Sequence, residues 1–148
     1  ALRFSEELTL PLKDHKRLGA INKIIGYTPN SWQKYSVHII EPILKYIPYN
    51  LEIKSFHSAK TNKAHILNLT YSNGLSVQLN CVNEKYQPVK ITLHGENKVC
   101  ELVFEKTFDA FKSSLNNFID GVTSRKVKIT HSDMYRTVNL VELGLNYE

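Results

Sequence analysis

The feature that most constrains the fold is a turn signal near the middle of the chain. Residues 71–75 read Tyr-Ser-Asn-Gly-Leu, with apolar residues alternating on both sides. An Asn-Gly pair in this setting favours a two-residue type I′ turn, in which both residues have positive φ. We therefore expect Asn73 and Gly74 to fold residues 75–81 back antiparallel against residues 64–71. A chain with this hairpin must contain an antiparallel sheet.

Alternating apolar residues predict further strands around the hairpin, at residues 20–27, 51–56, 89–94 and 99–104. We expect them to extend it into an antiparallel meander joined to the first strand. One face of this sheet should carry both apolar and polar side chains, and we expect a partner subunit to cover it. The side chains assigned to that face are Leu67, Leu69, Gln78, Asn80, Thr92 and His94.

Helical spacing dominates both ends of the chain. Residues 1–18 mix apolar and charged side chains around a proline, so we expect two short helical pieces that close near Gly19. Thr107 is an N-cap candidate for a helix over residues 107–122. The apolar face of that helix consists of Phe108, Phe111, Leu115, Phe118, Ile119 and Val122.

A last helix is predicted from its start signal. Thr130 and Asp133 have the spacing of a capping box. The side chains that this helix should bury are Met134, Val138, Val141 and Leu145. Strands flanked by helices predict an α+β fold, with a largely antiparallel mixed sheet and helices on one face.

One further helix, over residues 35–47, carries the candidate for a chemical site. His38 falls in its first turn, beside an apolar stripe of helical period. Pro42 removes a backbone donor, so we expect a bend near His38. The stripe consists of Val37, Ile40, Ile43 or Leu44, and Ile47.

His38 supports two interpretations. As a helix-end histidine it bonds a backbone carbonyl and has no chemical role. As a site residue it contacts a substrate or transfers a proton, because imidazole titrates near neutrality and suits hydroxyl-to-carbonyl chemistry. Nearby aromatics either wall a sugar- or polyol-sized pocket or pack as core and rim residues. They are Tyr27, Trp32 and Tyr35.

Composition excludes several classes of protein. The chain has 148 residues, 42% hydrophobic and 22% charged, which indicates one globular domain over residues 1–148 rather than a disordered or fibrous protein. No apolar run reaches the roughly 18 residues that span a bilayer, and the first residues lack signal-peptide order. We expect a cytoplasmic protein that does not bind membranes. Because the chain starts at Ala1 without Met, we also expect it to be a piece of a longer protein.

Other chemistries find little support in the sequence. The six histidines lack metal-ligand spacing, so we expect no metal. Cys81 and Cys100 fall in predicted strands and should be free thiols. The net charge of +5 is spread along the chain, so nucleic acid is not expected as a partner. A basic turn at residues 125–128 either meets phosphate or is solvated.

Several segments occur in an order that has a family counterpart. They are Leu2-Arg3-Phe4, Leu18-Gly19-Ala20-Ile21, Trp32 and Tyr35 before His38, the Asn73-Gly74 hairpin, and residues 108–121 before a basic turn and a final helix. Together they cover nearly the whole chain. In this succession the sequence resembles the C-terminal domain of the Gfo/Idh/MocA oxidoreductases.

The resemblance implies a glyceraldehyde-phosphate-dehydrogenase-like domain that binds a sugar or cyclitol and forms a homodimer or homotetramer through its sheet. It also implies a preceding dinucleotide-binding domain, absent from this chain, that holds NAD or NADP in the full-length parent. The chain alone should therefore bind no cofactor. In the family, a histidine matching His38 contacts the reacting hydroxyl. Lys34 stands where an aspartate is common.

Two functions remain open on this basis. In the first, the chain is the substrate-binding and oligomerisation part of a sugar or polyol oxidoreductase, inactive by itself. His38 is then catalytic, and Tyr27, Trp32, Lys34 and Tyr35 bind substrate. In the second, the chain is a non-catalytic sugar-binding or assembly domain, as Lys34 suggests.

Overall fold

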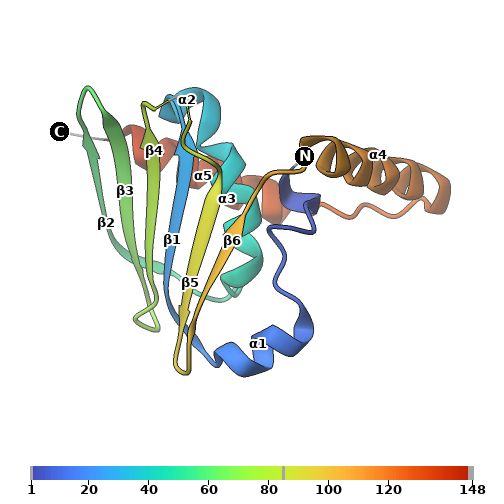
Figure 1. Ribbon diagram of the computed structural model, residues 1–148, viewed down its shortest axis with the longest axis horizontal. Coiled ribbons are helices and arrows are strands. Elements are labelled where there is room, and N and C mark those ends of the chain that lie inside the picture. The colour runs from blue at the N-terminus through green and yellow to red at the C-terminus, as the bar shows by residue number, and fades with distance from the viewer. Residues whose placement is uncertain (1, 85, 147–148) are drawn as a thin grey trace.

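Six strands form one sheet in the computed structural model, which describes residues 2–84 and 86–146. Their order across the sheet is β2-β3-β4-β1-β5-β6. Figure 1 shows the strands side by side in this order, with the helices behind and beside the sheet. The strands are β1 (Ile21–Pro29), β2 (Ile53–Lys60), β3 (Ala64–Tyr71), β4 (Ser76–Val82), β5 (Lys90–Gly95) and β6 (Val99–Val103).

The first strand lies in the middle of the sheet and divides the expected meander in two. β1 pairs parallel with β4 and antiparallel with β5, whereas β2-β3-β4 and β5-β6 are antiparallel sets. The prediction of a continuous meander was therefore wrong at the β4 to β5 step. Alternation identifies which segments are strands, but pairing between distant strands depends on tertiary packing.

The hairpin is present, but its turn differs from the expected type. Only Gly74 has positive φ (86°), and Asn73 does not. The Gly74 N–H donates to the Tyr71 carbonyl at 2.9 Å, and the Tyr71 N–H donates to the Leu75 carbonyl. This pattern is typical of a three-residue loop whose last residue is left-handed, a position that favours glycine because it has no Cβ.

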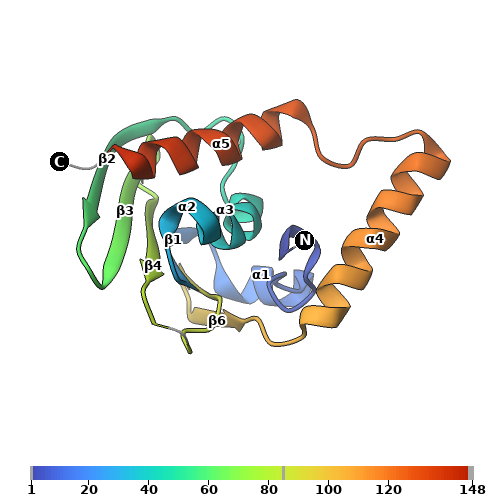
Figure 2. The same cartoon turned by 90° about the horizontal axis from the view of Figure 1, so that it is seen from above.

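Helices cover one face of the sheet. α3 packs on β1 and β5, and α5 packs on β2 and β3, as Figure 2 shows from above. α4 instead stands away from the sheet and contacts η1. The helical elements are η1 (Leu2–Phe4), α1 (Leu12–Leu18), α2 (Trp32–Tyr35), α3 (Val37–Ile43), η2 (Leu44–Tyr46), α4 (Thr107–Ser124) and α5 (His131–Leu145).

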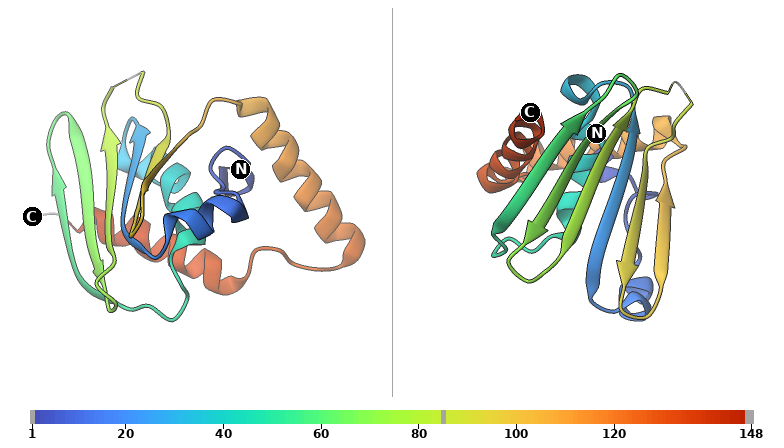
Figure 3. Two further views of the ribbon diagram at one scale, coloured as in Figure 1. Left: turned by 60° about the horizontal axis from the view of Figure 1, so that its bottom comes forward. Right: turned by 90° about the vertical axis from the view of Figure 1, so that its left-hand side faces the viewer.

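The core lies between the sheet and this helical layer. Gly26 of β1 allows α3 to approach closely, because a Cβ there would lie 2.6 Å from Ile43 Cδ1. Leu67 and Leu69 of β3 are buried and alternate with the outward-facing Asn68. They belong to the core face, so their assignment to the mixed face was wrong. The opposite, open face of the sheet is seen at the right of Figure 3.

The two last helices differ from expectation in what they bury. Lys106, not Thr107, is the N-cap residue of α4. The capping box of α5 is present, because Thr130 accepts the Asp133 N–H and the Asp133 carboxylate accepts the Thr130 N–H. The apolar face of α4 is exposed, and so are Met134, Val138 and Leu145, whereas Leu140 and Gly144 are buried. The helical period of apolar residues identifies an apolar stripe, but it does not show whether another element packs against that stripe.

Candidate functional site

His38 lies just after a break between two helices. Ser36 ends α2, where its N–H donates to the Trp32 carbonyl, and the Ile40 N–H donates to the Ser36 carbonyl. The interruption falls two residues before His38, but Ser36 keeps right-handed helical φ and ψ (−55° and −35°), so the bend stays a prediction. Pro42 lies buried inside α3, one turn later. The imidazole therefore lies in the first turn of α3. Val37 and His38 are partly buried there, whereas the next residues, Ile39 and Ile40, are fully buried.

The imidazole is half-buried and contacts an aromatic ring. The rings of Tyr35 and His38 meet edge to face, with centroids 5.4 Å apart and planes at 70°. Burial lowers the pKa of His38 below its ordinary value of 6.5, although the charge of Glu41 opposes this shift. A group with this lowered pKa is neutral at pH 7 and can accept a proton.

Glu41 is a neighbour that the sequence reasoning did not single out. It follows His38 by three residues on the same helix. Residues three apart in a helix lie on the same side, so this spacing was a usable signal. The nearest carboxylate in sequence therefore follows His38, and the residue four positions before His38 is Lys34.

Trp32 does not line a pocket beside His38. Its side chain is 1% exposed. Its indole N–H donates to the Val141 carbonyl at 2.9 Å, and its ring stacks on His65 with centroids 4.9 Å apart. These contacts make Trp32 a core residue, and its contact with a substrate stays a prediction. Trp32 joins the start of α2 to the last turns of α5.

Tyr27 is also displaced from the predicted site. Its neighbour Gly26 faces α3, so alternation along β1 directs the Tyr27 side chain to the open face of the sheet. There the Lys90 ammonium lies 5.7 Å from the Tyr27 ring centroid and 3.1 Å from Glu101. Of the four predicted substrate contacts, Trp32, Lys34 and Tyr35 lie in α2, the short helix before His38, where Trp32 is buried and Lys34 is exposed.

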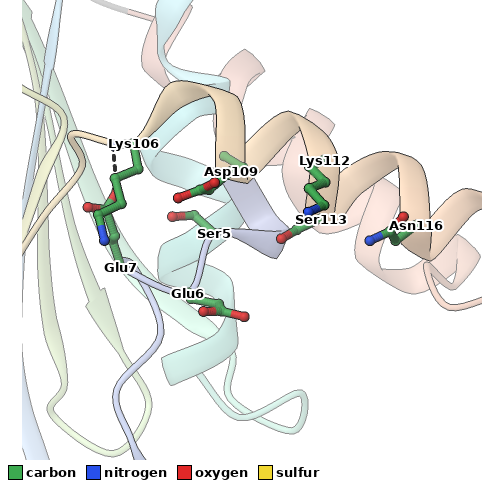
Figure 4. Close-up of a pocket in the computed structure, with 9 residues that line it drawn as sticks. Ser5, Glu6, Glu7, Lys106, Asp109, Lys112, Ser113 and Asn116 are labelled. Carbon is green, nitrogen blue, oxygen red and sulfur yellow. Dashed lines mark hydrogen bonds between the residues drawn. The ribbon is translucent and has the colours of Figure 1, made fainter.

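A polar groove of about 310 Å³ separates the N-terminal segment from α4. Figure 4 shows Ser5, Glu6 and Glu7 on one side of it, with Asp109 and Lys112 of α4 on the other. The Glu7 carboxylate accepts the N–H groups of Glu105 and Lys106 at 3.0 and 2.8 Å. These hydrogen bonds lower the pKa of Glu7. Glu7 thus attaches the start of α4 to the N-terminal segment.

Three further cavities lie in other parts of the fold. One of about 480 Å³ lies at the C-terminal end of α4, between Phe4, Phe118 and Val127. One of about 630 Å³ lies beside η2, and one of about 150 Å³ lies near Trp32. His38 lines none of these four cavities.

A buried ionic network supports η1 and α5. Arg3 lies 2.6 Å from the Asp133 carboxylate, which also accepts the Tyr49 hydroxyl. The guanidinium of Arg136 lies 4.6 Å from the Tyr49 ring centroid. Burial alone would raise the pKa of Asp133, but hydrogen bonds from Tyr49 and Arg3 hold it well below its ordinary value. Asp133 was predicted only as a helix cap, because nothing local in the sequence points to Arg3.

Metal and membrane features are absent from the part of the chain that the structure describes. No cluster of three or more histidine, cysteine or acidic side chains among these residues is suited to a metal ion. None of their helices is long and apolar enough to cross a bilayer. Cys81 and Cys100 are free thiols, as predicted.

No family model and no curated protein matches this sequence. Solved structures do match its fold. Scyllo-inositol dehydrogenase from Lactobacillus casei superposes with a TM-score of 0.80 at 14% identity, over 98% of this chain and 59% of that one. Myo-inositol 2-dehydrogenase from Lactobacillus plantarum superposes with a TM-score of 0.71 at 13% sequence identity. The match covers 88% of this chain and 55% of that one.

A third solved structure extends this group of neighbours. KijD10, a 3-ketoreductase from Actinomadura kijaniata in complex with NADP, gives a TM-score of 0.66 at 16% identity, over 88% of this chain and 53% of that one. The matched region is the C-terminal part of these proteins. The chain has the fold of a Gfo/Idh/MocA C-terminal domain. It spans little more than half the length of the dehydrogenases and reductase that it matches.

Proposed function

We propose that this chain is the substrate-binding and oligomerisation domain of an NAD(P)-dependent oxidoreductase that acts on a hydroxyl of a sugar, a sugar derivative or a polyol. The observation that carries the proposal is His38, a half-buried imidazole with a lowered pKa at the start of α3. The neighbours support the substrate class, since one structure of the Lactobacillus casei enzyme holds NAD(H) and scyllo-inositol.

His38 would accept the hydroxyl proton of the substrate. Oxidation of a carbinol breaks a C–H bond and an O–H bond, and a nicotinamide cofactor, when bound, would supply the hydride acceptor. The neutral imidazole takes the proton, and in the reverse direction the imidazolium returns it to the carbonyl oxygen. The edge contact with Tyr35 restricts the orientation of the ring. Lys34, one residue earlier, is an exposed donor for a second hydroxyl.

The residues of this chain do not fit a dinucleotide. Its six glycines are isolated from one another, and the spacing of a phosphate-binding glycine loop does not occur. We therefore assign the cofactor to a preceding dinucleotide-binding domain of the whole protein. The chain supplies the proton acceptor and the surface that orients the substrate.

The open face of the sheet is the proposed surface for a homodimer or homotetramer. Its side chains are mixed and partly buried, among them Ile25, Tyr27 and Thr92. His94 Nε2 lies on this face, buried and without a hydrogen-bond partner among the described residues. A second sheet packed here would cover these partly buried side chains. Light scattering on the whole protein tests this assembly.

A histidine substitution tests the chemical role. In the full polypeptide, His38→Ala should lower kcat for oxidation by about 10²–10⁴-fold, the usual contribution of a general base. The Kd for NADH should change less than two-fold. His131→Ala is the matched control, because this exposed histidine begins α5. Unchanged turnover in His38→Ala would exclude the proposed role.

A non-catalytic sugar-binding or assembly domain is the second candidate. Lys34, where an aspartate is common in the family, favours it, because a cation there does not raise the basicity of the imidazole. Calorimetric binding of a sugar by a whole protein that never reduces NAD⁺ or NADP⁺ would support this candidate. Oxidation of any polyol by the whole protein would exclude this second candidate.

A further inference from the structure

The cavity beside η2 is lined by basic side chains and by no acidic side chain of the described residues. It has a volume of about 630 Å³ and lies between α1, η2 and the β3-β4 hairpin, at the bottom of the fold in Figure 1. Arg3, His15 and Lys45 line it. The polar groove beside α4 differs, because three acidic side chains line that groove. Positive charge therefore dominates the cavity beside η2, which we call the η2 cavity.

Lys45 has no carboxylate partner in the η2 cavity. Its ammonium donates to the Thr9 hydroxyl at 2.8 Å. Partial burial and the charge of Arg3 lower the pKa of Lys45 to about 8, although the charge of Glu41 opposes this shift. An anion bound in the cavity would stabilise the charged ammonium, because an opposite charge nearby favours the charged form.

Asp133, the carboxylate beside Arg3, has no capacity left to neutralise the cavity. It pairs with Arg3 at 2.6 Å and accepts the Tyr49 hydroxyl. Its other oxygen accepts the N–H and the hydroxyl of Thr130. Asp133 does not line the η2 cavity. Arg3 keeps further N–H donors beyond this ion pair, since a guanidinium has five.

A second guanidinium lies behind the wall of the cavity. Arg136 Nη2 donates to the Ile47 carbonyl at 2.8 Å, and its guanidinium lies 4.6 Å from the Tyr49 ring centroid. Ile47 and Tyr49 both line the η2 cavity. Arg136 Nη1 is buried and has no hydrogen-bond partner among the described residues. The negative end of the α3 dipole offsets only about half a unit charge, which is less than the positive charge gathered here.

The rest of the lining suits an organic group. Ile21, Leu44 and Leu75 contribute apolar side chains, and Asn73 adds an amide. Small-molecule sites commonly have volumes of about 300–1,000 Å³. The η2 cavity therefore has room for an anionic group together with a small carbon skeleton.

We infer that the η2 cavity binds a phosphate group, either as inorganic phosphate or as the phosphate monoester of a small organic molecule. Lys45, Arg3 and His15 would donate to its oxygens, as charge-assisted hydrogen bonds are the strong ones. This site is separate from His38, because the seven residues from His38 to Lys45 correspond to roughly 10 Å along a helix axis. It does not depend on the proposed function.

Isothermal titration calorimetry of the full polypeptide with inorganic phosphate tests this site. The wild type should bind phosphate saturably at millimolar concentration. Lys45→Met should weaken binding at least ten-fold, because a charge-assisted hydrogen bond is lost, whereas Lys45→Arg should keep it. Lys16→Met is the matched control, since this exposed lysine of α1 carries the same charge but does not line the cavity. The control should change the Kd less than two-fold.

The outcomes separate a built site from general charge attraction. Equal losses in Lys45→Met and Lys16→Met would overturn the inference, and so would unchanged binding in Lys45→Met or no saturable binding by the wild type. Thermal denaturation checks that Lys45→Met is folded, as expected from its exposed contact with Thr9.

A second titration identifies the source of the phosphate group. Tighter binding of phenyl phosphate than of inorganic phosphate would make the ligand a monoester, and equal or weaker binding would make it inorganic phosphate. Both titrations are run without NAD(P)H or a polyol. A failure of the proposed oxidoreductase function would therefore leave this test unaffected.

Discussion

Gly144 provides the sharpest test of the packing that places His38. It lies in the last turn of α5, and a Cβ added there would overlap ring atoms Cζ2 and Cε2 of Trp32. The indole cannot move aside easily, because it is fully buried, stacked on His65 and hydrogen-bonded through its N–H to Val141. Gly144→Ala should therefore disturb α2, the helix that leads into His38.

Two opposing effects set the size of this change. Alanine favours a helix over glycine by about 1 kcal/mol. Overpacking of a core costs about 1–3 kcal/mol, and more where a rigid ring must move. Because the overlap at Trp32 involves ring atoms, the upper end applies, and the net loss in the free energy of unfolding should be about 2 kcal/mol. For a chain of this size the Tm should fall by roughly 4–8 °C.

Urea denaturation followed by circular dichroism measures this loss, and a double-mutant cycle assigns its cause. Trp32→Phe should be less destabilising in the Gly144→Ala background than in the wild type, with a coupling energy of about 1 kcal/mol or more. Gly121→Ala is a milder comparison, since its Cβ would lie 3.2 Å from the Lys126 carbonyl, a tight contact but not an overlap with a buried ring. This account would be refuted if Gly144→Ala had the same free energy of unfolding as the wild type. It would also be refuted if the losses in Gly144→Ala and Trp32→Phe were strictly additive in the double variant.

Two further predictions concern pH and helix capping. Burial lowers the pKa of both His38 and His65 below 6.5, so the unfolded chain binds more protons below that pH. The free energy of unfolding should therefore fall between pH 7.5 and 5.5. A rise over this range in urea titrations would contradict the assignment. Thr130→Ala removes the side chain that accepts the Asp133 N–H and should cost about 0.5–2 kcal/mol by thermal denaturation, whereas the exposed Thr123→Ala should cost less.

The sequence was sufficient wherever the determining interactions are local. The hairpin at Gly74 and the capping box of Thr130 and Asp133 depend on residues within four positions of one another. The six strands and the α+β class follow from alternation and spacing. The position of His38 at the start of a helix is local too, because the apolar stripe and Pro42 lie within the same segment.

Local patterns could not show the structure where distant residues decide it. Nothing local in the sequence indicates that the carbonyl of Val141, more than a hundred residues away, holds the Trp32 indole N–H in the core. Alternation puts Tyr27 on the face opposite Gly26, but only the packing of the helices decided which of these two faces receives α3 and His38.

The α4 helix marks the boundary between these two kinds of information. Its sequence determined a helix with an apolar seam, since the period of three and four residues is a local property. Only the tertiary structure decided that the seam faces outward, because the small side chains of Ala110 and Ser114 allow close contact with the body of the domain. The sequence likewise supplied the imidazole of His38, whereas its lowered pKa depends on the burial that the packing of α3 imposes.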